Sequence, residues 1–311
     1  MPTDWNRSPL LDLADALPGT ELHSALLEVM RRRAAARSPA DVLAQYRRDR
    51  FVAPAGRSPG HGPASSTAAG RCGLIDLRVL VALDAELLAA ASAFDAIELS
   101  PLAPLGACST IAPTDQHRVV SALRATEVVS DPTNVLALEC AERLRRAPDA
   151  AVHLTTSQRV VRAQPVPPLP GYAAHFRIFV LASAGRETAE HGFTVDALAL
   201  HVHTMLTALD RLEQHGYAFG ARRVEVLARA ERAAVADRVA ARVHATRGVL
   251  DHPYYSGGVR YRIWVTAKDG SEAPIIDGGT FDWVAKLAAN RRAVYVATGM
   301  GAQLAAFAFR R

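Results

Sequence analysis

The sequence predicts an α+β fold in which a mostly antiparallel sheet is flanked by helices, with a small helical segment ahead of it. In several long stretches apolar residues recur three and four positions apart, which is typical of amphipathic helices, while other stretches alternate apolar and polar residues as strands do. Neighbouring strands are joined by turn-rich segments, and helices are segregated between them. This order favours an α+β domain over a doubly wound sheet.

Residues 1–52 indicate a helical N-terminal segment. Residues 21–37, ELHSALLEVMRRRAAAR, have helical spacing, and residues 38–50 open with Ser38 as N-cap and Pro39 at the first helical position. Residues 53–70 are rich in Gly, Pro, Ser and Ala and cannot build a core, so they predict a linker or exposed loop. The main domain is therefore expected to span residues 71–311.

The elements of this main domain follow from the same patterns. In chain order we predict a helix at 77–94, a strand at 96–105, a helix at 134–146, strands at 151–164 and 175–185, a helix at 195–216, a strand at 222–228, a helix at 231–245, a strand at 258–267, and a strand running into a helix at 292–309. The two strands on either side of the proline-rich residues 165–172 are expected to pair as a hairpin.

Charge and cysteine content narrow the class of protein. The net charge of +5 arises from 36 Lys and Arg set against 31 Asp and Glu, which favours a solvated arginine surface over a nucleic-acid footprint. Cys72, Cys108 and Cys140 are widely spaced, so they support neither a disulfide framework nor a Cys-x-x-Cys metal site. No targeting segment and no apolar run of membrane-spanning length is visible. We therefore expect a cytoplasmic protein without a metal site.

Two glycine-containing segments could approach a ligand, although each also has a purely structural explanation. Residues 277–283, DGGTFDW, could bring backbone and acids to a ligand, or could form an ordinary turn. Residues 297–304, ATGMGAQL, lack the ending of a P-loop, and their glycines could also serve a close strand-to-helix crossing. His201 and His203 lie two apart in a predicted helix, so they point to different faces and make a poor metal pair.

The order of the motifs is more informative than any one of them. Read in sequence, VVSDPT, VVRAQ, GYAAHFRIF, RGVLDHPYYSGGVRYRIW, DGGTFDW and ATGMGAQL resemble the catalytic core of class II aminoacyl-tRNA synthetases, in the histidyl branch and its paralogue, the regulatory subunit of ATP phosphoribosyltransferase. The resemblance covers about residues 71–311. It implies a class II synthetase-like sheet and a homodimer formed through the region around Pro101 and Pro104.

The resemblance also implies a set of site residues. Histidyl enzymes carry an arginine, a glycine, a leucine and an acid before YYTG, and residues 247–257 match this pattern with a short insertion. An amino-acid site would then use the following residues: Asp131, Thr133, Arg162, Arg247, Asp251, Tyr254, Tyr255, Gly257, Asp277, Gly278 and Gly279. A nucleotide site would use Arg162, Gly299, Gly301 and Gln303. Asp131 could equally be the N-cap of the helix that follows it.

Departures from the family pattern shape the functional hypotheses. The motif 2 acid is replaced by Gln164, the FHQ that follows the motif 2 loop reads FRI at 176–178, and Gln303 stands where the family's motif 3 ends in arginine. Only about thirty residues separate strand 222–228 from Tyr254, where histidyl enzymes insert a further domain. These departures argue against ATP activation and against tRNA as a partner.

The leading hypothesis is a non-synthetase paralogue that binds an amino acid, histidine foremost, as a sensor or regulatory subunit. A catalytic phosphoribosyltransferase is one protein partner that the resemblance suggests. The alternative is an enzyme that forms an aminoacyl adenylate for an acceptor other than tRNA. In that case ATP and Mg²⁺ would bind, and Arg162 and Arg247 would stabilise the developing phosphate charge.

Overall fold

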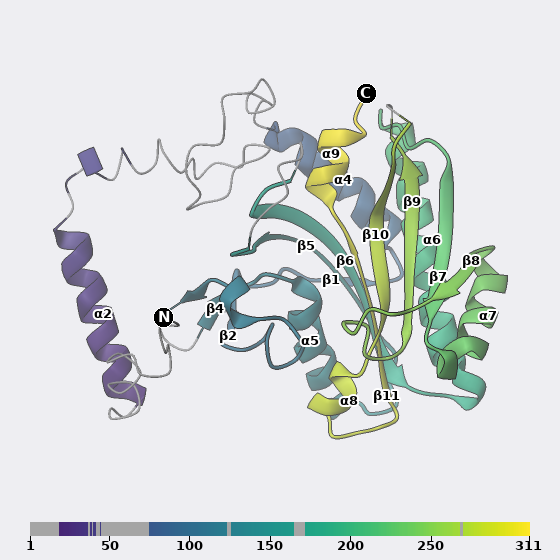
Figure 1. Cartoon of the computed structure of the whole chain (residues 1–311), viewed down its shortest axis with the longest axis horizontal. Coiled ribbons are helices and arrows are strands. Elements are labelled where there is room, and N and C mark those ends of the chain that lie inside the picture. Colours follow the sequence, from purple (N-terminus) through teal and green to yellow (C-terminus); the bar gives the residue numbers. More distant parts are fainter. Residues whose placement is uncertain are drawn as a thin grey trace, which may run out of the picture.

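The structure is a computed structural model, shown in Figure 1, and it describes residues 19–36, 38, 40, 41, 44, 75–122, 126–164, 172–267 and 270–311. The helix predicted at 21–37 is confirmed as α2 (Gly19–Ala35). The predicted linker 53–70, most of the helix predicted at 38–50, the start of the main domain at residue 71 and nearly all of the loop 165–172 lie outside the described residues.

An eight-stranded sheet forms the centre of the molecule. In spatial order its strands are β1 (Asp95–Ala96), β5 (Val152–Val161), β6 (His175–Arg186), β11 (Ala293–Met300), β10 (Glu272–Phe281), β9 (Val259–Thr266), β7 (Arg222–Ala228) and β8 (Thr246–Val249). Only the two edge pairs, β1 with β5 and β7 with β8, are parallel. The predicted mostly antiparallel sheet and the hairpin of β5 and β6 are thus confirmed.

A second, three-stranded sheet and the helices complete the fold. The small sheet consists of β2 (Leu102–Pro104), β4 (Thr126–Val128) and β3 (Ser121–Ala122). The helices of the main body are α4 (Leu77–Ala90), α5 (Pro132–Arg146), α6 (Gly192–Gln214), α7 (Ala233–Val243), α8 (Trp283–Leu287) and α9 (Ala302–Ala308), with short 3₁₀ turns η3 (Gln116–Arg118), η4 (Ala189–His191) and η5 (Ala230–Arg232). None of the helices in the described part of the chain is long and apolar enough to cross a membrane.

Each face of the large sheet has its own hydrophobic core. Helices α4, α6, α7 and α9 cover one face, which we call the covered face, and their apolar side chains pack on residues such as Leu181 and Ile263. Helices α5 and α8 pack on part of the other face, which we call the cavity face, against Leu154 and Val180. Because side chains alternate along a strand, neighbours such as Val180 and Leu181 serve opposite cores.

Two expectations are corrected. Of the two explanations for residues 277–283, the ordinary turn is wrong, because residues 277–281 belong to the central strand β10, which pairs with β9 and β11. The strand predicted at 96–105 is interrupted, because residues 95–96 join the large sheet and residues 102–104 join the small one. His201 and His203 do lie on different sides of α6, one buried and one exposed.

Candidate functional site

A cavity of about 550 Å³ lies on the cavity face, between α5, the loop 252–255 and strands β6, β10 and β11. Most of the sequence-predicted site residues line it, namely Asp131, Thr133, Arg162, Tyr254, Tyr255, Asp277, Gly278, Gly299 and Gly301. These residues come from five separate stretches of sequence that the fold brings together. The volume is typical of a small-molecule site.

Asp131 forms one wall of the cavity at the start of α5. Its Oδ1 accepts hydrogen bonds from the backbone N–H of Thr133 at 3.0 Å and from the Thr133 hydroxyl at 2.7 Å, so Asp131 is the N-cap of this helix. Its Oδ2 lies toward the cavity, 3.4 Å from the Tyr254 hydroxyl and 3.7 Å from Arg162 Nη2. The capping role and a ligand-binding role are therefore compatible, because they use different oxygen atoms.

Arg162 follows β5 and reaches the same wall. Its Nε donates to the Ser130 carbonyl at 3.1 Å, and its guanidinium lies 5.0 Å from the centre of the Phe176 ring. These two contacts fix the orientation of the side chain while leaving its terminal nitrogens toward Asp131 and the cavity. Arg118, which sequence reasoning missed, also lines the cavity and makes no ion pair with any residue that the structure describes.

The two adjacent tyrosines separate the cavity from the aromatic core. Tyr254 packs edge-on against Phe281 and Trp283, with ring centres 5.5 and 5.7 Å apart. Burial raises the pKa of Tyr254 well above its ordinary value, and burial also raises that of Tyr255. Both hydroxyls therefore stay protonated at neutral pH, and each gives its one proton to a carboxylate, Tyr254 to Asp131 and Tyr255 to Asp277.

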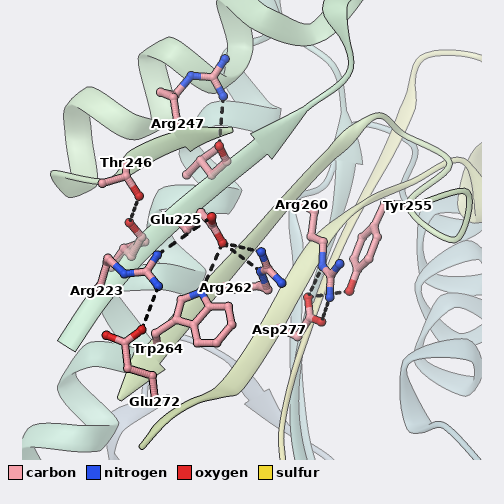
Figure 2. A network of polar contacts seen from close by, with 12 residues as sticks. Arg223, Glu225, Thr246, Arg247, Tyr255, Arg260, Arg262, Trp264, Glu272 and Asp277 are labelled. Carbon is pink, nitrogen blue, oxygen red and sulfur yellow. Dashed lines mark hydrogen bonds and ion pairs between the residues drawn. The ribbon is translucent and has the colours of Figure 1, made fainter. Parts of the chain in front are cut away.

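Asp277 on β10 is held from two sides. Arg260, on the neighbouring strand β9, pairs with both of its carboxylate oxygens, and the Tyr255 hydroxyl donates to Oδ1 (Figure 2). The guanidinium of Arg260 also lies 4.8 Å from the centre of the Tyr255 ring. A Cβ on Gly279 would lie 2.6 Å from Cδ1 of Tyr255, so glycine is what lets this tyrosine rest on β10.

Beyond Asp277 the cavity face continues as a ladder of charged and aromatic side chains over β9 and β7. Glu225 accepts from Arg262 Nη2 at 2.6 Å and from the indole N–H of Trp264 at 3.2 Å (Figure 2). The guanidinium groups of Arg223 and Arg262 both lie over the Trp264 ring, at 5.1 and 4.8 Å. This part of the sheet satisfies its own charges and does not line the cavity.

Arg247 lies away from the cavity. It sits on β8 opposite Val226 of β7, on the covered face. Its Nε pairs with Asp237 of α7 at 2.8 Å, while Nη1 donates to the Val226 carbonyl at 3.1 Å. Because side chains alternate across a sheet, this pairing register puts Arg247 on the opposite side from Asp277.

Four further predicted residues do not line this cavity. Asp251 is exposed in the loop, and Gly279 lies beneath Tyr255. Gly257 lines a different, smaller cavity. Gln303 is buried, and its Oε1 accepts from Nη1 of Arg159 at 3.2 Å.

The residue of α9 that does line the cavity is Leu304. Within the described chain, no basic side chain of α9 faces the site, because α9 consists of AQLAAFA. Sequence reasoning also missed Arg260 and His252. Arg260 had a usable signal, since the alternation VRYRIW puts Arg260, Arg262 and Trp264 on one face of a strand.

Comparison with known proteins gives a match in structure only. Neither the family models nor the curated protein sequences contain a match to this chain. Among solved structures, a Bacillus halodurans protein described as an ATP phosphoribosyltransferase regulatory subunit/histidyl-tRNA synthetase matches with a TM-score of 0.54 and 12% identity, over 74% of this chain and 79% of the other.

Two further solved structures, a histidine–tRNA ligase subunit and a histidyl-tRNA synthetase, match to a similar extent. A histidine–tRNA ligase subunit from Alicyclobacillus acidocaldarius has a TM-score of 0.54 and 13% identity, over 79% of this chain and 98% of its own. Histidyl-tRNA synthetase from Staphylococcus aureus has a TM-score of 0.53 and 11% identity, over 72% of this chain and 62% of its own. The chain therefore has the class II synthetase-like fold of histidyl-tRNA synthetases and of the ATP phosphoribosyltransferase regulatory subunit.

Proposed function

We propose that this chain is a non-synthetase paralogue that binds a free amino acid in the cavity beside α5 and acts as a sensor or regulatory subunit. The observation that carries the proposal is the pair of opposite charges on one wall. Asp131 presents Oδ2 for an ammonium group, and Arg162 stands 3.7 Å away with terminal nitrogens for a carboxylate. A zwitterion matches this pair, because each of its charges meets the opposite one.

The aromatic wall supports a side chain that is flat and can donate a hydrogen bond. Tyr254 and Tyr255 give their protons to Asp131 and Asp277, so their oxygens are left as acceptors, and His252 lines the cavity beside them. Histidine combines a small flat ring with an N–H donor, so it is the first ligand to test.

The nucleotide half of the site supports a degenerate rather than an active ATP site. Gln303 is turned to Arg159, and Leu304 takes the place on α9 that faces the cavity. An apolar side chain cannot neutralise a triphosphate. Gly299 and Gly301 line the cavity. Because they have no side chains, they leave room for a nucleotide but supply no charge to bind its phosphates.

A regulatory subunit must also meet other chains. In and next to the strands of the small sheet, Leu102, Leu105 and Val120 are 44%, 51% and 38% exposed, and the first two are neighbours of Pro101 and Pro104 in the sequence. This apolar group fits the homodimer that we expect in this region. A catalytic phosphoribosyltransferase is the partner to test first, since one structural neighbour bears the name of such a regulatory subunit.

A thermal-shift screen against the twenty amino acids, each with and without Mg-ATP, tests the proposal. A ligand that binds only the folded state raises the melting temperature by mass action. We expect one amino acid, histidine first, to raise it and Mg-ATP to add nothing. Isothermal titration that detects no amino-acid binding at millimolar concentration would contradict the proposal.

A second candidate is an adenylating ligase that serves an acceptor other than tRNA. The observation in its favour is that Arg118 and Arg162 both line the cavity, which gives two cations for a phosphate. Amino-acid-dependent exchange of pyrophosphate into ATP is its test. Exchange with any standard amino acid would replace the sensor proposal by this one.

A further inference from the structure

A second cavity of about 240 Å³ lies behind the loop that carries the two tyrosines. It is bounded by the start of α6, by η5, and by residues of β9, β10, α8 and β11. We propose that this second cavity binds a small oxyanion, a phosphate or carboxylate group, between Arg232 and Arg291. The argument rests on the balance of its charged groups and is independent of the amino-acid site.

The acids of the second cavity already have donors. Glu187 accepts hydrogen bonds from the backbone N–H of Thr194 at 3.3 Å and from the Thr194 hydroxyl, and its Oε2 also lies 3.4 Å from Nδ1 of His191. Asp282 accepts from the Ser256 hydroxyl at 2.7 Å and pairs with Lys286 at 2.8 Å. Lys286 thus neutralises Asp282, whereas Glu187 is held by neutral donors, so the cavity sets two guanidinium charges against one carboxylate charge.

Both arginines of the second cavity, in contrast, lack an acid partner among the described residues. The side chain of Arg232 makes one polar contact with a described residue, from Nη1 to Nδ1 of His191 at 3.4 Å, and Arg291 makes no ion pair with a described residue. The carboxylates of Glu190 and Glu231 are close in sequence but do not line the cavity. Two guanidinium groups without an acid partner that line one cavity supply the positive charge to bind an anion.

The backbone around the second cavity fixes the position of Arg232. Gly258 has φ +85°, and a Cβ at this position would lie 2.8 Å from Cγ of Arg232, so the arginine stem packs directly on the glycine. His191 has φ 55°, a left-handed conformation that is costly for a residue with a side chain. This conformation keeps the His191 ring beside Arg232.

The second cavity adjoins the amino-acid site, so a bound anion could affect that site through the loop between them. Phe281 lines both cavities, and Ser256 and Gly257 of the second cavity directly follow Tyr254 and Tyr255 of the first. The sequence had assigned Gly257 to the amino-acid site. In the structure it lies instead at the junction, where an anion would contact the far end of the tyrosine loop.

Titration of the purified full chain with inorganic phosphate tests the proposal, with chloride at matched ionic strength as the reference. We expect a saturable rise in melting temperature that chloride does not give. The double variant Arg232→Ala/Arg291→Ala should weaken phosphate affinity by about tenfold or more, because each arginine supplies a charge-assisted hydrogen bond. Arg145→Ala/Arg146→Ala removes the same charge elsewhere on the surface and should behave as the parent protein.

Three results would overturn the proposal. One is a parent protein that responds to phosphate no more than to chloride. Another is a double variant that keeps the parent's affinity. The third is a response that survives in the double variant but disappears in Arg118→Ala/Arg162→Ala, since this would locate the anion in the larger cavity. If the double variant is unstable, Arg291→Gln alone, at an exposed position, should still weaken phosphate binding.

Discussion

The two faces of the large sheet use polar side chains in opposite ways. On the covered face, Ser183, His201, Thr298 and Tyr261 form a chain of hydrogen bonds between 2.7 and 2.9 Å, and all four residues are at most 1% exposed. On the cavity face, Asp277 pairs with the charged Arg260 beside open space. The covered face therefore buries neutral hydrogen-bonding groups, whereas the cavity face carries an ion pair at the edge of a cavity.

The difference follows from how strands β9, β10 and β11 alternate. Tyr261 and Thr298 both pair with Gly278 and point to the helices of the covered face. Arg260 precedes Tyr261 and Asp277 precedes Gly278, so both point to the cavity face instead. A buried ion would carry a large desolvation cost, so the covered face uses uncharged partners. The cavity face can keep charges because water or a ligand completes their solvation.

The largest effect should come from Thr298→Val on the covered face. This change leaves Nδ1 of His201 and the Tyr261 hydroxyl without their shared partner in a dry core. We expect the free energy of unfolding to fall by about 2–6 kcal/mol, since each of the two unsatisfied buried groups costs roughly 1–3 kcal/mol. Urea unfolding measures it. Thr266→Val, at a half-buried position on the other face, is the control, and equal losses in the two variants would contradict the comparison.

Acid should weaken the covered face through His201. Burial lowers the pKa of His201 to about 3, while the unfolded chain takes up this proton near pH 6.5. The stabilisation is therefore complete above pH 6.5 and declines as pH falls toward 3. Between pH 7.5 and 5.5 we expect about 1.4 kcal/mol of loss from this histidine.

Urea unfolding of the parent and of His201→Gln at both pH values isolates the contribution of His201. Burial also lowers the pKa of His153 and of His175, so both proteins should lose stability in acid. The parent should lose more than the variant. Equal losses would mean that His201 accepts its proton in the folded state.

On the cavity face, Arg162→Ala should affect binding more than folding. The side chain is 34% exposed and its ion pair with Asp131 is long, so the free energy of unfolding should change by less than about 1 kcal/mol. Affinity for the bound amino acid should fall by about tenfold or more. Arg159→Ala is a matched control from the end of β5, which Arg162 follows, because Arg159 contacts Gln303 and does not line the cavity. Titration calorimetry with histidine compares the two variants.

Much of the fold could be predicted because its elements are long and periodic. Strand β7 begins and ends at the predicted residues, and α6 differs from its predicted range by a few residues at its start and two at its end. Strand β10 was missed because two adjacent glycines usually indicate a turn. In the structure, those glycines serve close packing: a Cβ on Gly278 would lie 2.8 Å from the Tyr261 ring. Local pattern cannot anticipate such a long-range contact.

Motif order and cavity geometry agree for part of the candidate site, whose role in binding stays a prediction. Asp131, Arg162 and Tyr254, which the resemblance groups together, line one cavity. Arg260 was not chosen, because its partner Asp277 lies on a strand that the sequence did not reveal. The four-residue strand β8 was also not anticipated, and its register decides which way Arg247 points.

Arg247→Ala is the smallest expected effect and the most direct test of that register. The lost contacts are an ion pair to the exposed Asp237 and hydrogen bonds to backbone carbonyls, so we expect about 1 kcal/mol of lost stability. Amino-acid affinity should stay within about twofold of the parent. Arg260→Ala, which removes the ion pair to Asp277 and the ring contact with Tyr255 at the cavity, should change that affinity more. If Arg247→Ala instead abolished binding while leaving urea unfolding unchanged, β8 would have to pair one residue out of step, with Arg247 directed into the amino-acid site as the family resemblance implies.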